Sequence, residues 1–142
     1  MCLTCELNYI NKEFRLFGQK WGDSQLTGSF GGQVTYSFAN QNFPDQFGTF
    51  DTFITEHDFQ DEVIESLAAW ENIANIRFIN VPDSEDVDIR FGWRDIDGPG
   101  NILGQTTVPA SGELKNVVVA LDVDENWFLL GDAPVDKVDF SS

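Results

Sequence analysis

Basic side chains and histidine are scarce in this sequence. It has 8 lysine and arginine residues against 24 aspartate and glutamate residues, which gives a formal net charge of −16 at pH 7. Nucleic acids and anionic membranes bind proteins largely through lysine and arginine, so we expect neither as a partner. The single histidine, His57, stands between two acidic residues, and we expect it to be a surface residue without a functional role. One imidazole cannot supply a zinc site made of three histidines.

Cysteines and long apolar runs are also few. Cys2 and Cys5 form a lone C-x-x-C pair with no histidine nearby, so we interpret them as incidental rather than as a metal or redox site. No apolar run reaches the ~18 residues of a membrane-spanning helix, and residues 1–6 lack the pattern of a signal peptide. The 142 residues, 42% of them hydrophobic, are enough for one globular domain with a core of its own.

Apolar periodicity predicts five strands. They are expected at residues 34–38, 76–81, 87–93, 102–108 and 117–123. In the third strand, apolar residues alternate with Asp88, Arg90 and Gly92, as in a pleated strand. The fifth strand is apolar on both faces, so we expect it to be covered on both sides. Residues 1–19 show no periodicity and are interpreted as an N-terminal tail, with a single domain over residues 20–142.

A helix is predicted from about residue 56 to residue 73, because apolar side chains recur there at spacings of three and four. We expect Thr55 to be its N-cap, with Asp58 completing a pattern like a capping box. Trp70 lies on the apolar stripe and is expected in the core, as is Trp93. The order of elements predicts an α+β fold: a mixed sheet with the helix on one face.

Two acidic loops are the most informative local feature. Residues 97–102 read DGPGNI and residues 122–127 read DVDENW. A hard dication binds six or more oxygens, and loops of this kind can offer carboxylates and backbone carbonyls together. Asp, Gly, Pro and Asn are also the commonest turn residues, so two ordinary acidic turns are the alternative. Because both halves occur in one chain, we favour a calcium site, with Trp127 packed against it.

These loops and four upstream segments resemble the metzincin zinc endopeptidases, in particular the matrixins and the bacterial serralysins. The upstream segments are KWGD (residues 20–23), GGQVTYSF (31–38), AAWENIANIRF (68–78) and DVDIRFG (86–92). The resemblance runs from Lys20 to about Ser142. It implies a zincin-like N-terminal subdomain, in which a twisted mixed five-stranded sheet carries one long helix.

The resemblance also implies roles for particular residues. The implied calcium ligands are the side chains of Asp97, Asp122 and Glu125 and the main-chain oxygens of Gly98, Gly100 and Ile102. The implied substrate strand contains Leu103, Gly104 and Gln105, which would pair with an extended peptide through the backbone. Gln105 and Ala120 stand where matrixins place histidines of a structural zinc site. We therefore expect no structural zinc, and this departure favours bacterial matrixin-like or serralysin-like relatives.

The zinc motif of the family, HExxHxxGxxH, does not occur in the sequence. We therefore expect the chain alone to be inactive and interpret it as part of a secreted zinc- and calcium-dependent metalloendopeptidase, cut off before the zinc helix. Calcium would bind in this chain and catalytic zinc outside it. The alternative is a complete but catalytically inactive module that binds proteins in the presence of calcium. The cleavage preference and the oligomeric state are not predicted.

Overall fold

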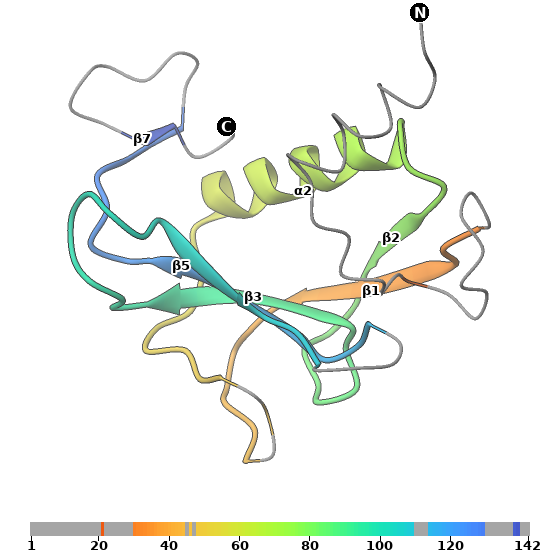
Figure 1. The fold of residues 1–142 in the computed structure, drawn as a ribbon, viewed down its shortest axis with the longest axis horizontal. Coiled ribbons are helices and arrows are strands. Elements are labelled where there is room, and N and C mark those ends of the chain that lie inside the picture. Colours follow the sequence, from red (N-terminus) through yellow and green to blue (C-terminus); the bar gives the residue numbers. More distant parts are fainter. Residues whose placement is uncertain are drawn as a thin grey trace, which may run out of the picture.

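Helix α2 lies across one face of a five-stranded sheet (Figure 1). The computed structural model describes residues 21, 30–44, 46, 48–109, 114–129 and 138–139. The predicted tail at residues 1–19, with Cys2 and Cys5, lies outside the described residues. The helix is α2 (His57–Glu71), and the strands are β1 (Gln33–Phe38), β2 (Arg77–Asn80), β3 (Ile89–Arg94), β4 (Gly104–Thr107), β5 (Val117–Asp122), β6 (Trp127–Phe128) and β7 (Val138–Asp139).

The large sheet has the strand order β2-β1-β3-β5-β4. β1 is parallel to β2 and to β3, and β3 is parallel to β5, whereas β4 is antiparallel to β5. The prediction of an α+β fold with a mixed five-stranded sheet and one helix on it is confirmed. The strand bounds differ from the predicted ones by one or two residues. The short pair of β6 and β7 was not predicted.

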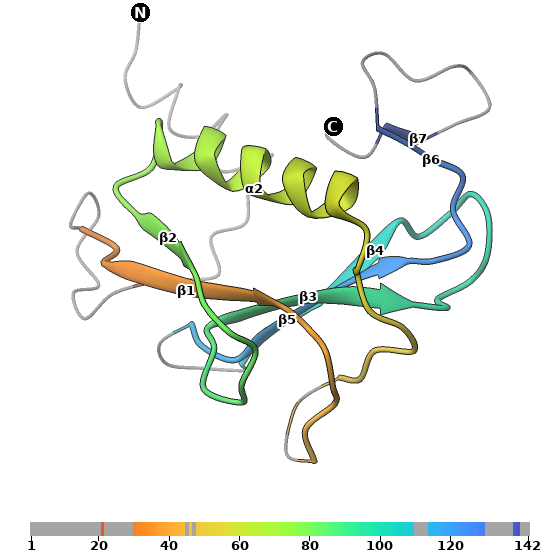
Figure 2. The ribbon, with the colours of Figure 1, turned by 180° about the vertical axis from the view of Figure 1, so that it is seen from behind.

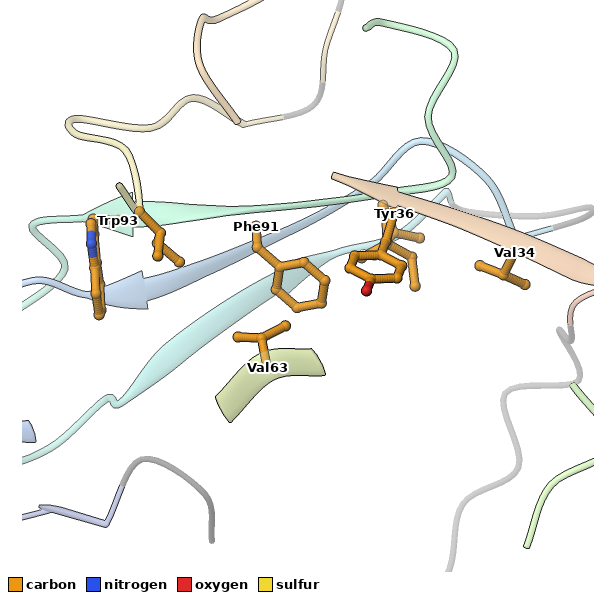
Figure 3. Close-up of a cluster of buried hydrophobic side chains, with 8 residues drawn as sticks. Val34, Tyr36, Val63, Phe91 and Trp93 are labelled. Atoms are coloured by element: carbon orange, nitrogen blue, oxygen red, sulfur yellow. The ribbon is translucent and has the colours of Figure 1, made fainter. Parts of the chain in front are cut away.

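The helix face of the sheet contains the main hydrophobic core. Alternate residues of β1 and β3 point toward α2, and Val63 is the buried residue of the helix that meets them (Figure 3). The ring of Trp93 packs edge-on against Phe59 of α2, with 5.1 Å between centroids and an interplanar angle of 89°. The expectation that Trp93 belongs to the core is confirmed, since only 5% of its surface is exposed.

Two expectations for the helix are wrong. The N-cap is Glu56 rather than Thr55, and it makes no side-chain cap hydrogen bond. The chain is instead anchored by Gln60, whose Nε2 donates to the carbonyl of Ile54 at 2.7 Å. Trp70 is 60% exposed, because it lies at the rim of an apolar pocket between α2 and the sheet and not beneath the helix. His57 is exposed, as expected.

The opposite face of the sheet is covered by the connection between β1 and α2. This connection runs below the sheet, away from the helix (Figure 2). Its residues Ala39 and Phe50 form a second buried cluster with Val118 and Ala120 of β5. Gly92 is required here, because a Cβ at that position would stand 2.4 Å from the ring of Phe50. The sheet is therefore covered on both faces, by a helix on one and by a long connection on the other.

Arg90 of β3 is fully buried on this second face, with 0% of its surface exposed. Its Nε and Nη2 donate to the two carboxylate oxygens of Asp83 at 2.6 and 2.5 Å. Nη2 also donates to the carbonyl of Gln41 at 2.7 Å, and Nη1 donates to the side chain of Gln46. The guanidinium group lies over the ring of Phe43, 4.5 Å from its centroid. One side chain thus joins β3 to two connections below the sheet. One runs from β1 to α2, and the other runs from β2 to β3.

Asp83 is equally well bonded. Ser37 Oγ donates to it at 2.7 Å and the backbone N–H of Asn40 at 3.0 Å, in addition to Arg90. Burial acts to raise the pKa of Asp83, but the hydrogen bonds from Arg90, Asn40 and Ser37 outweigh burial and lower that pKa below its ordinary value. The carboxylate therefore stays ionised inside the protein.

Replacing Arg90 with methionine is expected to destabilise the protein by about 3–5 kcal/mol, because it leaves the Asp83 carboxylate buried without its cation. Chemical denaturation should show a lower midpoint. Arg77→Met is the matched control, since Arg77 is exposed, and we expect its effect to stay within about 0.5 kcal/mol. Equal midpoints for the two variants would contradict a structural role of the buried pair.

Candidate metal site and open strand edge

The sheet brings the two predicted acidic loops together. β3 and β5 are parallel, so their C-terminal ends lie at the same end of the sheet, where Arg94 pairs with Asp122. Residues 97–102 follow β3 and residues 122–127 begin at the end of β5. The backbone N–H of Asp97 donates to Asp122 Oδ2 at 3.1 Å, and that of Gly100 donates to Glu125 Oε1 at 2.7 Å. Carboxylates of the second loop therefore hold the backbone of the first.

Asp122 has a partner at each of its polar atoms. Its N–H donates to the carbonyl of Leu103 at 2.9 Å, and its Oδ1 accepts the N–H of Asp124 at 3.0 Å. Its main-chain carbonyl accepts the indole N–H of Trp127 at 2.8 Å. The expectation that Trp127 packs against this loop is confirmed. The Trp127 ring also lies against Trp93, with centroids 6.3 Å apart, so the loop is joined to the core.

The side chain of Asp122 is charged and fully buried, with 0% of its surface exposed. Burial acts to raise the pKa of this carboxyl. The backbone N–H groups of Asp124, Asp97, Ile96 and Gly98 act in the opposite direction, and the net result is a pKa below the ordinary value for aspartate. Amide dipoles rather than a basic side chain therefore stabilise the charge.

The donor atoms at this place suit a hard cation. Asp122 and Glu125 are buried, and among the described residues neither carboxylate forms an ion pair with a basic side chain. Gly98 and Gly100 have positive φ angles of 78° and 76°, and their α-carbons face open space. Carboxylate and carbonyl oxygens without a competing cation are the ligands that calcium prefers.

The three carboxylates predicted as calcium ligands, those of Asp97, Asp122 and Glu125, do not form one cluster. In the part of the chain that the structure describes, no three His, Cys, Asp or Glu side chains converge as metal ligands. Asp97 is exposed, and its Oδ1 accepts the N–H of Ile102 at 3.3 Å, within its own loop. The structure thus brings the two loops into contact, and the assignment of calcium ligands stays a prediction.

The predicted substrate residues lie at the outer edge of the sheet. β4 is the outermost strand and pairs on its inner side with β5. The bond from Asp122 N–H to the Leu103 carbonyl shows that Leu103 faces β5. Because backbone groups alternate in direction along an antiparallel strand, Gln105 also faces β5, whereas Gly104 and Thr106 direct their N–H and C=O groups outward.

Arg94 at the end of β3 was not singled out by the sequence. Its Nε donates to the carbonyl of Thr49 at 2.8 Å, and its Nη1 reaches Gln105 Oε1 at 3.4 Å. Gly48 leaves room for the guanidinium group, since a Cβ there would lie 2.9 Å from Arg94 Nη2. Arg94 therefore connects the β1–α2 connection to the edge strand, a contact between segments distant in sequence that no local motif indicates.

A mixed five-stranded sheet with one helix on it is consistent with the N-terminal subdomain of a metallopeptidase of the matrixin type. The sequence profile of the matrixin family matches residues 25–141, and the chain belongs to this family. The predicted resemblance to matrixins is confirmed, whereas the serralysin part of that prediction stays untested.

Two curated relatives illustrate the similarity. The hatching enzyme of Paracentrotus lividus is 30% identical over an alignment of 112 residues that covers 73% of this chain and 17% of that protein. Matrix metalloproteinase-C of Caenorhabditis elegans is 30% identical over an alignment of 82 residues that covers 52% of this chain and 13% of that protein. The chain thus spans less than a fifth of either relative. Within the described residues, no helix combines the length and the apolar character needed to cross a membrane.

The lowered pKa of Asp122 predicts a pH dependence of stability. Since the pKa is lower in the folded state than in the unfolded state, the carboxylate stabilises the fold above the unfolded value of about 3.9. This contribution is lost as the pH falls through the folded pKa. We expect the unfolding free energy of Asp122→Asn to fall less steeply below about pH 4 than that of the unmodified chain. Asp83 shifts in the same direction, so part of the slope should remain.

The exposed Asp86 provides the control for this measurement. Asp86→Asn removes one charge from the same acidic protein without removing a buried carboxylate, and its acid slope is the reference against which that of Asp122→Asn is compared. Identical slopes for Asp122→Asn and the unmodified chain would show that the buried carboxylate is not stabilised as described.

Proposed function

We propose that this chain is the substrate-side part of a secreted zinc- and calcium-dependent metalloendopeptidase. The observation that carries the proposal is the position of β4. In a chain of the matrixin family, an antiparallel strand whose outer edge has no partner strand among the described residues directly follows a loop that is held by two buried carboxylates. Secretion is proposed from the family resemblance alone.

An extended peptide is the proposed ligand of the open edge. A free strand edge offers backbone donors and acceptors at the spacing of another extended chain, so a peptide can add as a further strand. The outward groups of Gly104 and Thr106 would make these bonds. The strand carries no charged side chain and is exposed over most of its length, so its backbone is accessible to an incoming chain.

The residues of this chain do not fit a catalytic zinc. The sequence has one histidine, and no three ligand side chains converge among the described residues. We propose that the zinc ligands belong to a part of the enzyme outside these 142 residues. The role of this chain is then to hold and orient the peptide, and we derive no catalytic step from it.

Calcium does fit the paired loops. Bound calcium would neutralise the buried carboxylates of Asp122 and Glu125, which hold the backbone of the loop at residues 97–102. The loop at residues 97–102 runs directly into β4, and Asp122 also holds Leu103 at the start of that strand. A cation that fixes this loop would therefore also fix the position of the strand that we propose for peptide binding.

Calcium is expected to raise the melting temperature of the chain, because a ligand that binds the folded state alone stabilises it. The gain is about 2.7 kcal/mol when free calcium is a hundredfold above the dissociation constant. Asp122→Ala and Glu125→Ala should remove the response in calorimetry. Glu85→Ala, at an exposed position between β2 and β3, should retain it. No shift for the unmodified chain in excess calcium would refute the calcium assignment.

A catalytically inactive module that binds proteins in the presence of calcium is the second candidate. It is favoured by the single histidine, since an open strand edge can bind a peptide without cutting it. The coding sequence beyond Ser142 separates the two candidates. Continuation into an HExxH motif supports the peptidase, and an immediate stop codon supports the binding module.

The purified 142-residue chain should not cleave a quenched peptide or casein with zinc and calcium added, because neutral imidazole ligands for zinc are missing. The same protein extended by its downstream coding sequence should cleave, and a chelator should abolish that activity. Chelator-sensitive turnover by the 142-residue chain would contradict the proposed location of the zinc site.

A further inference from the structure

The other outer strand of the sheet, β2, has two backbone positions that point away from its neighbour. The N–H groups of Arg77 and Val81 donate to carbonyls of Gly32 and Tyr36 on the β1 side, at 3.1 and 2.9 Å. In a parallel pair, every second residue makes the interstrand bonds and the residues between them face the other way. Phe78 and Asn80 therefore direct their backbone groups outward.

The outward N–H of Phe78 is bonded to a side chain of the same protein. It donates to Oε1 of Glu71, the last residue of α2. The chain reverses direction between α2 and β2, so that β2 lies beneath the C-terminal end of the helix (Figure 2). The Glu71 carboxylate thus occupies the place where the carbonyl of an added strand would accept a hydrogen bond. In the described part of the molecule, β4 shows no corresponding side-chain bond on its outer edge.

The amino-acid sequence of β2 and its flanking residues makes self-association possible wherever this edge is left without such a hydrogen bond. Residues 76–81 read IRFINV, six residues rich in β-branched and aromatic side chains, with one charge and no proline. Segments of this composition pair readily with copies of themselves when a strand edge is free. Just before them in the sequence, Ile73 adds exposed apolar surface, since 79% of its surface is exposed.

We propose that Glu71 closes the β2 edge against strand addition by a second copy of this chain. The carboxylate satisfies the outward N–H of Phe78, and an incoming strand would have to displace it and leave a charged group without its hydrogen bond. The sheet therefore has one closed edge and one open edge, and Glu71 determines which is closed. This inference does not depend on calcium or on peptidase activity.

Three variants at Glu71 and one control test the proposal. Glu71→Gln keeps the length and the acceptor oxygen but loses the charge. Glu71→Asp keeps the charge but is one methylene shorter, and Glu71→Ala loses both. Glu65→Ala removes the same charge from an exposed position on the same helix. Near-ultraviolet circular dichroism identifies the variants that retain the native fold.

Amide hydrogen exchange measures the bond directly in dilute monomer. We expect the Phe78 amide to exchange about tenfold faster or more in Glu71→Ala and Glu71→Asp than in the unmodified chain, as for loss of a bond to a charged acceptor. In Glu71→Gln and Glu65→Ala the rate should stay within about threefold. An unchanged rate in both Glu71→Ala and Glu71→Asp would overturn the proposal.

Sedimentation at about 1 M salt tests the consequence, because repulsion between the acidic copies is then screened within about 3 Å. Glu71→Ala and Glu71→Asp should form dimers or larger species at concentrations where the other proteins remain monomeric. In these species the Phe78 and Asn80 amides should exchange more slowly than in the monomer of the same variant. Monomeric behaviour of every folded variant, or association that leaves both amides fast, would overturn closure of this edge by Glu71.

Discussion

The buried pair of Arg90 and Asp83 is the interaction on which the lower half of the structure depends. Among the described residues the sheet carries one helix, so irregular chain covers its second face and has to be held in place there. Arg90 solves this problem with charge-assisted bonds to both connections that cross the face. Such a pair gives directional geometry that an aliphatic side chain cannot give, although a well-packed apolar group could be as stabilising.

Local pattern was sufficient to predict the helix and the five strands of the large sheet. Alternation of apolar residues located the five strands, and the spacing of Phe59, Val63 and Leu67 located the helix. Arg90 shows the limit of this reasoning. Its alternation with apolar neighbours is typical of a solvent-facing position, but the direction it points is covered by the connection between β1 and α2, whose Gln41 lies 49 residues earlier in the chain. Trp70 shows the opposite error, because it was expected to be buried and is exposed. Helical periodicity places it on the apolar stripe but does not show where the buried part of the helix surface ends.

For the candidate site as well, local motifs predicted some features and contacts between distant segments determine the others. Motifs indicated both acidic loops, and parallel pairing of β3 with β5 explains why they meet. Motifs could not indicate that the Asp122 carboxylate is surrounded by backbone amides, because those bonds depend on the path of the other loop. The outward direction of Gly104 likewise depends on the register between β4 and β5, and the contact of Glu71 with β2 depends on the turn after the helix.

The mixed sheet has a kinetic consequence. Tyr36 pairs with Ile89, and Ile89 pairs with Val117, so the parallel ladders join residues far apart in the chain, and each must close a long loop before its contacts form. Within this sheet as described, β4 and β5 are the pair joined by a short stretch of sequence. Loop closure costs more entropy as the loop grows, and sheets dominated by distant contacts fold slowly. We therefore expect the hairpin that contains the open edge to form early and the β1 half to assemble onto it.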